Sequence, residues 1–422
     1  MARLTYQQLE LIKEKMNVKQ IWSFSKMSTF SQCTWAYFLR YIQKIRVKGD
    51  NCYTVWGTNS HDIIQGFYED EFTYEGMLVE LEQRILDYLM ADDKKLKFPN
   101  DSEWESYIAN IRHYFTNTEV IPYKVVNEKP VLAEFKGIEK YIFQGYIDSE
   151  YYDEQNNFVI LDYKTSSMSG FTGKKLIEKA QQLIIYAFGV SKFRKIPMEK
   201  IRIRYDMMKY CNVTFMQKNG KEKTSKAERR LWVAHMANQI RKDLQDVPKE
   251  IEKVNKEIAK LERKLNLKKT TEEEKPAINA LIEVEKQKIV EIEKDLFDVV
   301  TIDDMITTAI NENNLDNMPP FVKNKYKVGN CYIDVELTPE VLEEVESQIV
   351  DTLNKIIKKT EAENHEEAFT RGKIENSDSY YCVNLCDMRD HCKFYKEFKE
   401  HNAMFLEKEA PSDEQILAML GL

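Results

Sequence analysis

The order in which the hydrophobic period changes along this chain constrains its fold more than any other feature. Apolar residues first recur at helical spacing, then alternate as they do in strands, and then return to helical spacing around one further strand. The predicted helices are Ser25–Tyr41, Gly57–Leu89, Trp104–Phe115, Lys174–Val190 and a segment that ends at Ile240. The predicted strands are Val131–Phe135, Tyr141–Tyr152, Phe158–Tyr163 and Ile201–Met208. The first three strands form a meander, so we expect an α/β core behind a mainly helical amino-terminal part.

A coiled-coil arm is predicted to interrupt this core. Apolar residues recur in steps of three and four in two successive segments, which are separated by a turn at 268–276. The two seams are Ile251, Val254, Ile258, Leu261, Leu265 and Ile278, Ile282, Ile289, Ile292, Leu296, and Glu285 breaks the second. An antiparallel hairpin that adds surface for a partner or a substrate explains this pattern. The predicted parts of the chain are therefore 1–125, a core at 126–242, an inserted hairpin at 243–318, and 319–422.

Charge is distributed unevenly along the chain, although the formal net charge is −8. Residues 160–230 contain 17 Lys or Arg against six Asp or Glu, and residues 1–50 contain nine against three. Such basic segments are expected of a phosphate-backbone contact, and a solvated charged face would give the same pattern. The longest apolar stretches, such as Leu183–Val190, fall short of the roughly 20 residues of a membrane span. The first 20 residues also lack the apolar core of a secretion signal, so we expect a cytoplasmic protein without membrane contact.

Two acidic residues on neighbouring predicted strands form the sharpest local signal. Gly145-Tyr-Ile-Asp148 lies on one strand, and Asp162-Tyr-Lys164 lies on the next. Antiparallel pairing can place the two aspartates side by side, and Asp162 and Lys164 project to one face because side chains alternate. Carboxylates suit Mg²⁺ or Mn²⁺, which can bind a phosphodiester oxygen and activate water. Lys164 would orient that water or neutralise the developing charge, whereas a surface ion pair is the alternative explanation.

Four further residues are candidates for the same site. His61, near the start of a helix, could supply an imidazole ligand, and Glu134, on the preceding strand, could supply another carboxylate. Gln182 and Tyr186 lie four residues apart on the next helix, so they share a face and can bind Lys164 or a substrate phosphate. A second acidic pair at Asp334 and Glu336 is interpreted as structural, because no lysine or polar helix motif follows it in the required order.

Three of the seven cysteines lie within eleven residues near the carboxyl end, at Cys382, Cys386 and Cys392. This spacing is typical of iron–sulfur or zinc ligation, which needs a fourth ligand from His391 or a distant cysteine. An odd cysteine count without an export signal argues against a disulfide framework. The remaining thiols without ligand spacing, Cys52, Cys211 and Cys331, are expected to be ordinary core or surface residues.

In this order the motifs resemble those of the RecB-like branch of the PD-(D/E)XK nucleases. The resemblance implies a restriction-endonuclease-like mixed central sheet flanked by helices. It also implies that His61, Asp148, Asp162 and the main-chain carbonyl of Tyr163 hold the metal. Lys164 would then be the catalytic lysine. Gln182 and Tyr186 would orient DNA.

The cysteines extend the resemblance to the iron–sulfur subgroup of this branch, which includes CRISPR-associated exonucleases and AddB-type helicase–nucleases. Phe24–Cys33, followed by Tyr37 and Tyr41, is similar to the opening helix of that subgroup with its lone cysteine. The resemblance implies a 4Fe-4S cluster on Cys33, Cys382, Cys386 and Cys392, which would join the two ends of the domain. Three residues rather than two separate Cys382 from Cys386, so zinc stays the alternative.

Together these features predict a metal-dependent deoxyribonuclease, and the resemblance implies an exonuclease that acts on DNA ends or single strands. The sequence has no Gly-rich phosphate loop followed by Lys and Ser or Thr. Any helicase or recombination protein would therefore be a separate partner, for which the hairpin offers a contact surface. The alternatives are a DNA-end-binding or partner-binding subunit with little catalysis, and a zinc-stabilised adaptor that works through the hairpin.

Overall fold

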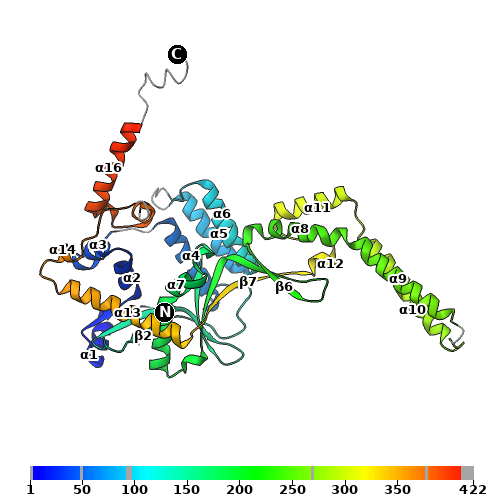
Figure 1. Cartoon of the computed structure of the whole chain (residues 1–422), viewed down its shortest axis with the longest axis horizontal. Coiled ribbons are helices and arrows are strands. Elements are labelled where there is room, and N and C mark those ends of the chain that lie inside the picture. Colours follow the sequence, from blue (N-terminus) through cyan, green and yellow to red (C-terminus); the bar gives the residue numbers. More distant parts are fainter. Residues whose placement is uncertain (1–2, 48–50, 92–96, 268–269, 376–378, 410–422) are drawn as a thin grey trace, which may run out of the picture.

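The computed structural model of the chain describes residues 3–47, 51–91, 97–267, 270–375 and 379–409. A mixed sheet of seven strands forms the centre of this part of the chain (Figure 1). The strands are β1 (Gln20–Trp22), β2 (Val126–Glu134), β3 (Tyr141–Tyr152), β4 (Phe158–Lys164), β5 (Ile201–Met216), β6 (Glu222–Glu228) and β7 (Tyr326–Val335). The predicted meander of β2, β3 and β4 is confirmed as antiparallel, and β4 pairs with β5 in parallel.

Helices cover both faces of this sheet, as an α/β fold requires. One core joins the sheet to α2 (Phe24–Gln32), α3 (Thr34–Tyr37), α7 (Gly173–Arg194) and α13 (Pro339–Thr360). The second core joins the opposite face to α4 (Cys52–Tyr68), α5 (Tyr74–Met90) and α6 (Asp101–Asn117). Along β4, Phe158 and Ile160 face the first core, whereas Val159 and Leu161 face the second. The strand is therefore buried on both sides, and its alternation directs Asp162 and Lys164 toward α7.

Two predicted helices are divided in the structure. The segment Ser25–Tyr41 breaks at Cys33, whose backbone is extended at φ −158° and ψ 112° and whose sulfur accepts the N–H of Ala36 at 3.4 Å. The segment Gly57–Leu89 is likewise divided between α4 and α5. At Cys33 the residue that ends α2 also caps α3, which hydrophobic spacing does not reveal.

A smaller third core lies beyond the carboxyl end of β4. There β5 runs past the end of β4, pairs with β6 and β7, and packs on α8 (Trp232–Gln245) and α11 (Val299–Glu312). The helices α9 (Val247–Leu265) and α10 (Lys275–Glu293) project from this base as the predicted antiparallel arm (Figure 1). Their seam buries Ile258, Ile278 and Ile282.

The other α-helices of the described chain are α1 (Tyr6–Met16), α12 (Pro320–Lys323), α14 (His365–Ala368) and α16 (Lys393–Glu409). The predicted cap at Thr338 is confirmed, since its hydroxyl accepts the N–H of Val341 at 3.3 Å and Pro339 begins α13. Asp334, interpreted from the sequence as structural, pairs with Arg204 at 2.6 Å. None of the described helices has the length and apolar character needed to cross a bilayer.

Candidate active site and cysteine cluster

The carboxyl end of β4 brings together the main residues predicted for the site. Asp162 is only 4% exposed and forms an ion pair with Lys164 on the same face of the strand. The Lys164 side chain is about one third exposed, so its amine borders solvent while its partner is buried. Burial lowers the pKa of Lys164, but the charges of Asp162 and Asp148 outweigh this effect, and the net pKa is raised. Lys164 is therefore held as a cation beside the carboxylates.

His61, on α4, connects the main chain of β4 with Asp148. Its Nε2 lies 2.7 Å from the carbonyl oxygen of Tyr163, and its Nδ1 lies 3.4 Å from Asp148 Oδ2. A carbonyl only accepts hydrogen bonds, so Nε2 is the donor, and a neutral ring then presents a lone pair on Nδ1 to the carboxylate. Two lone pairs face each other favourably only when a proton or a cation lies between them. His61, the Tyr163 carbonyl and Asp148 thus form one polar cluster suited to a positive charge.

Asp148 has the environment expected of a metal-binding carboxylate. Burial and the nearby charge of Asp162 raise its pKa to about 6. Its Oδ2 is buried and has no hydrogen-bond partner among the described residues. The buried Asp162 and the partly buried Asp148 repel one another unless a proton or a cation lies near them, and hard divalent ions favour such oxygen ligands. Asp148, Asp162, His61 and the Tyr163 carbonyl thus have the ligand chemistry of a Mg²⁺ or Mn²⁺ site, although the described side chains are not already arranged around a single ion.

Asp148 reaches this position because β3 changes the face that it presents. Ile147 packs in the first core, whereas the Ser149 hydroxyl contacts the Tyr163 hydroxyl at 3.4 Å in the second. Opposite this change, Glu128 on β2 adopts a left-handed backbone with φ +49°. The irregularity turns Asp148 toward the end of β4, which strict alternation along β3 would not predict.

Gln182 and Tyr186, the pair predicted on α7, lie next to this cluster. Gln182 Nε2 donates to the Tyr186 hydroxyl at 2.8 Å, so the two side chains act as a unit. Tyr186 packs directly on Gly145, where an added Cβ would lie 2.3 Å from Tyr186 Cε1 and Oη. The glycine of the Gly145-x-x-Asp148 motif thus admits the tyrosine ring beside the carboxylates.

Glu134 does not lie at this site. It pairs with Ile142 at the other end of β2 and forms an ion pair with Lys192 at 3.1 Å. It is six residues from Glu128, roughly 20 Å at about 3.3 Å per residue. Glu128 is the acidic residue of β2 whose charge acts on Asp148, where it raises the pKa. The distance of Glu134 from Asp148 depends on the register of β2 on β3, which the sequence did not supply.

The four predicted cysteines meet around one hollow, although 349 positions separate Cys33 from Cys382. Cys33, Cys382, Cys386 and Cys392 all line it, and the last three are at most 8% exposed. Arg371 donates to the Cys382 sulfur at 3.3 Å and to the Cys33 sulfur at 3.7 Å. Burial raises the pKa of the Cys386 and Cys392 thiols, so a bound metal and the Arg371 guanidinium would be needed to hold the sulfurs deprotonated.

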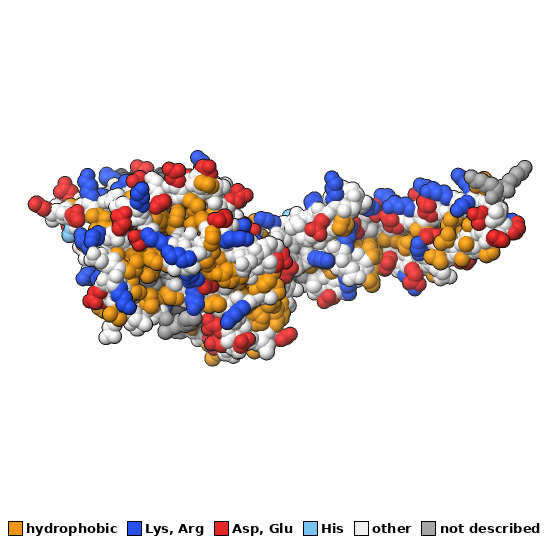
Figure 2. Space-filling model, turned by 90° about the horizontal axis from the view of Figure 1, so that it is seen from below, with side chains coloured by type: hydrophobic (Ala, Val, Ile, Leu, Met, Phe, Trp, Pro, Cys, Tyr) orange, Lys and Arg blue, Asp and Glu red, His pale blue; other side chains and the backbone are white. Residues whose placement is uncertain are grey.

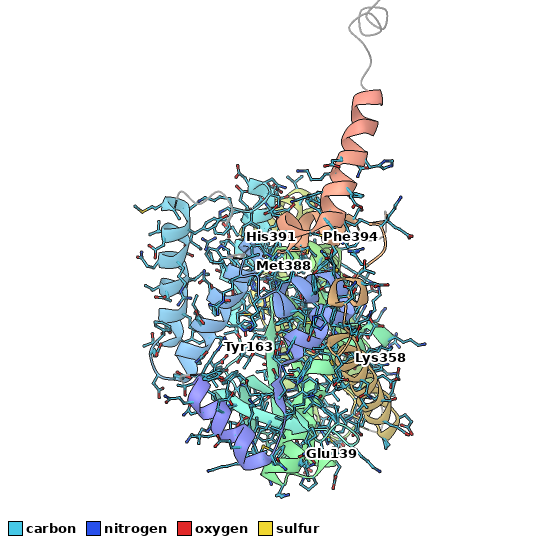
Figure 3. All side chains as sticks on the ribbon, turned by 90° about the vertical axis from the view of Figure 1, so that its left-hand side faces the viewer. Glu139, Tyr163, Lys358, Met388, His391 and Phe394 are labelled. Atoms are coloured by element: carbon cyan, nitrogen blue, oxygen red, sulfur yellow. The ribbon has the colours of Figure 1, made fainter. Side chains whose placement is uncertain are left out.

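His391, the alternative fourth ligand, does not line this hollow, although the nearby Met388 does. Both residues lie well above Tyr163 in Figure 3, at the end of the body that carries α16. Cys52, Cys211 and Cys331 are buried singly in the second, third and first cores. In the described part of the chain, no group of three or more His, Cys, Asp or Glu is already arranged to hold a single metal ion.

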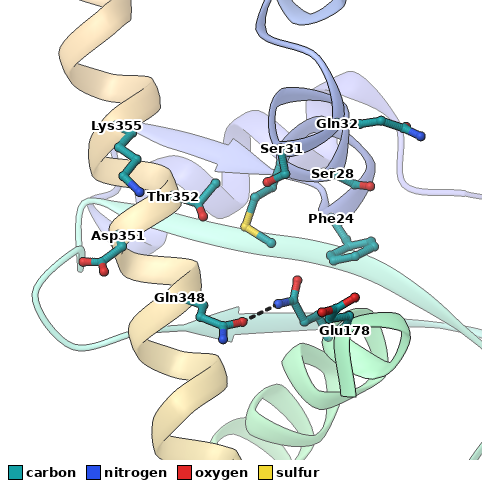
Figure 4. Close-up of a pocket in the computed structure, with 11 residues that line it drawn as sticks. Phe24, Ser28, Ser31, Gln32, Glu178, Gln348, Asp351, Thr352 and Lys355 are labelled. Carbon is teal, nitrogen blue, oxygen red and sulfur yellow. Dashed lines mark hydrogen bonds between the residues drawn. The ribbon is translucent and has the colours of Figure 1, made fainter. Parts of the chain in front are cut away.

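A separate polar hollow lies between α2, α7 and α13 (Figure 4). Gln181, the neighbour of Gln182, donates there to Gln348 Oε1 at 2.7 Å and so fixes α7 against α13. Glu178 and Asp351 line the hollow together with the single cation Lys355. This charge does not suit a phosphate backbone, so the hollow contributes to the placement of α7 rather than to a nucleic-acid surface.

The family comparison covers every residue of the candidate active site and of the cysteine cluster. A family model described as the PD-(D/E)XK nuclease superfamily matches residues 21–393. The chain belongs to the PD-(D/E)XK nuclease superfamily. Members of this superfamily are metal-dependent nucleases that typically use Mg²⁺ or Mn²⁺, and a nuclease fold implies DNA binding. None of the curated proteins compared with the chain matches it.

Proposed function

We propose that this nuclease belongs to the RecB-like branch and hydrolyses phosphodiester bonds of DNA at ends or in single strands. The observation that carries the proposal is the gathering of His61, Asp148, Asp162 and the Tyr163 carbonyl beside Lys164. These residues come from α4, β3 and β4, in the chain order of the RecB-like motifs. A purely structural ion pair would not require a second, partly buried carboxylate with a raised pKa next to it.

Each residue has a chemical role in this proposal. Asp148, Asp162, His61 and the Tyr163 carbonyl would hold the divalent ion, which when bound supplies Lewis acidity and lowers the pKa of water. The Lys164 ammonium, kept charged by the carboxylates, would orient the attacking water and offset negative charge on phosphorus. The Gln182–Tyr186 unit would position the DNA strand over the cluster. Glu134 has no role in the reaction.

A cleavage assay tests this proposal and distinguishes the mode of attack. Wild type and Lys164→Ala are incubated with Mg²⁺ or Mn²⁺ and with end-labelled linear DNA or closed circles, in single- and double-stranded form. Loss of linear DNA only, by the wild type only, is the result expected for an exonuclease. Cleavage of circles would show an endonuclease. Equal cleavage by Lys164→Ala would refute the assigned role, and binding without any cleavage would indicate a DNA-gripping subunit.

We further propose that Cys33, Cys382, Cys386 and Cys392 bind a 4Fe-4S cluster. The support is their common hollow, together with the Arg371 guanidinium that would stabilise thiolate charge. Four cysteine sulfurs that line one hollow fit the all-cysteine ligand set of a 4Fe-4S cluster, and zinc, which also takes four cysteines, stays the alternative. The cluster would fasten the break after α2 to the carboxyl end. Metal analysis of anaerobically purified protein that finds zinc and no iron would refute it.

The arm offers one surface for the separate helicase or recombination protein predicted from the sequence. On the outer side of α10, half-exposed Val284 lines a hollow with Glu283, Gln287, Lys288 and Glu291, and Val290 is also half-exposed. A mixed apolar and acidic face of this kind suits a protein partner better than DNA. Pull-down with alanine and lysine substitutions on this face would test the contact.

A further inference from the structure

The two helices of the arm present opposite surfaces. Their apolar residues meet in the seam, so each helix exposes its outer side. At 100° per residue, one arc of α9 on the side away from the seam contains six positions, every one Lys or Arg, and Glu252 and Glu257 border it. These residues, all exposed, are Lys249, Lys253, Lys256, Lys260, Arg263 and Lys264. The corresponding outer arc of α10 contains no basic residue. Only α9 therefore presents a uniformly positive face, which we call the α9 stripe.

The α9 stripe is available to a ligand despite its local ion pairs. Lys249, Lys253, Lys256 and Lys260 each contact an acidic residue one turn earlier on the flank of the arc. Their side chains remain 65 to 69% exposed, and exposed pairs of this kind are weak and screened by salt. Within the described chain no ion pair involves Arg263. Figure 2 shows basic side chains along one edge of the arm.

The size of the stripe matches a stretch of nucleic acid. It extends over 16 residues of helix from Lys249 to Lys264, a rise of about 22 Å at about 1.5 Å per residue. A duplex carries one charge per about 1.7 Å of its axis, so this length spans six to seven base pairs. Four of the basic residues, Lys253, Lys256, Lys260 and Arg263, also line a common hollow on the arm.

The arm is attached at the end of the sheet that carries the candidate active site. Lys164 lies level with Met207 in the parallel pair, and β5 continues in the same direction for nine residues to Met216. This extension is about 30 Å long, and the arm continues outward beyond it (Figure 1). DNA whose end occupies the site would therefore need about 15 base pairs to pass β5 and run along the stripe.

A polar surface connects the two places. Cys211, Val213 and Phe215 of β5 face the third core, which leaves the intervening side chains on the other face of the sheet. Across three neighbouring strands this face presents Asn212, Thr214, Thr224, Lys226 and Lys327. Hydroxyl, amide and ammonium groups are suited to contacts with phosphate oxygens and sugars.

We propose that the α9 stripe is a second DNA-binding surface, which holds the duplex about 10 to 15 base pairs from the site of cleavage. This inference rests on the proposed function, because it assumes that the site engages a DNA end. The stripe would bind the charged phosphate backbone without sequence preference, since lysine contacts to phosphate do not distinguish one base from another. It would keep the enzyme on long DNA between successive cleavage events.

Binding of labelled duplexes of 8 and 24 base pairs tests the proposal in EDTA, where cleavage is prevented. The wild type should bind the longer duplex at least about tenfold more tightly at low salt. The variant Lys253→Gln, Lys256→Gln, Lys260→Gln, Arg263→Gln should lose this gain, with a salt slope lower by roughly two to four, while binding of the short duplex is unchanged. A matched variant that neutralises Lys275, Lys286, Lys288 and Lys294 should retain the gain.

The outcomes separate this inference from the proposed function. If the stripe variant keeps the full preference for long DNA, the stripe does not bind DNA. The same conclusion follows if the variant loses only a protein partner. If the stripe variant cleaves the short duplex at the wild-type rate in the presence of metal, its active site is intact and any defect is confined to the arm. Absence of cleavage in the wild type would instead refute the proposed function.

Discussion

Replacement of Gly145 by alanine tests the geometry that couples α7 to the carboxylates. The added Cβ would lie 2.3 Å from Tyr186 Cε1 and Oη and 2.5 Å from Cζ. Carbon contacts are favourable at about 3.5 to 4.0 Å, so the ring must withdraw by more than about 1 Å. Tyr186 is only 5% exposed, and its withdrawal would break the 2.8 Å hydrogen bond from Gln182.

Two magnitudes follow for Gly145→Ala. Overpacking of this kind costs about 1 to 3 kcal/mol, so urea unfolding should show a loss of stability of that size. A displacement of about 1 Å in a positioning group lowers the rate by on the order of 100-fold, which single-turnover cleavage of end-labelled DNA would measure. Gly372→Ala is a suitable control, because a Cβ there meets no atom within 4 Å.

A second substitution identifies the cause of the effect. Tyr186→Leu removes the ring that the new Cβ would strike, so Gly145→Ala should cost under about 1 kcal/mol in that background. The reasoning is refuted if Gly145→Ala is as stable and as active as the wild type. It is also refuted if the full stability cost persists without the tyrosine ring.

Two further predictions concern protons and sulfur. Because the pKa of Asp148 is raised to about 6, Mg²⁺ should bind more weakly as pH falls through 6, and calorimetry in two buffers should detect about one proton released at pH 5.5 and almost none at pH 8. Because the pKa of Asp148 is higher in the folded than in the unfolded state, the protonated carboxyl stabilises the fold. This stabilisation is complete below about pH 3.8 and is lost as the pH rises through 6. In EDTA, Asp148→Asn should therefore stabilise the protein by about 1 to 3 kcal/mol at pH 8 and by almost nothing at pH 3, as measured by urea unfolding. Cys33→Ala and Cys382→Ala should each lower the iron content and the yield of folded protein, whereas Cys211→Ala should keep the iron; iron retained by Cys33→Ala would contradict the assignment.

The fold was predictable where one sequence period persisted over a whole element. The bounds of β3 match the prediction Tyr141–Tyr152, and the arm follows from its two apolar seams. Breaks were not predictable, because the division at Cys33 depends on a thiol that caps the following turn. The strands β6 and β7 were missed, since β6 is mostly exposed and polar and the side chains of β7 are divided between the first and third cores.

The candidate site was predictable from motif order but not from strand geometry. His61, Asp148, Asp162 and Lys164 are brought together as the family resemblance implied. Glu134 was the wrong choice on β2, because its distance from Asp148 depends on the register of β2 against β3. Cys33 could be assigned only through the resemblance, since no local spacing relates it to the carboxyl-terminal cysteines.

Cleavage by wild type and Asp162→Asn, compared across a Mg²⁺ titration, tests the central claim most directly. The asparagine keeps the size of the side chain but removes the charge that pairs with Lys164 and would hold the metal. We predict that wild-type cleavage of end-labelled linear DNA saturates with Mg²⁺. In Asp162→Asn the rate should fall by a factor of about 10³ or more, while DNA binding and iron content stay unchanged. Cleavage by Asp162→Asn at the wild-type rate, or cleavage independent of the metal, would contradict the account.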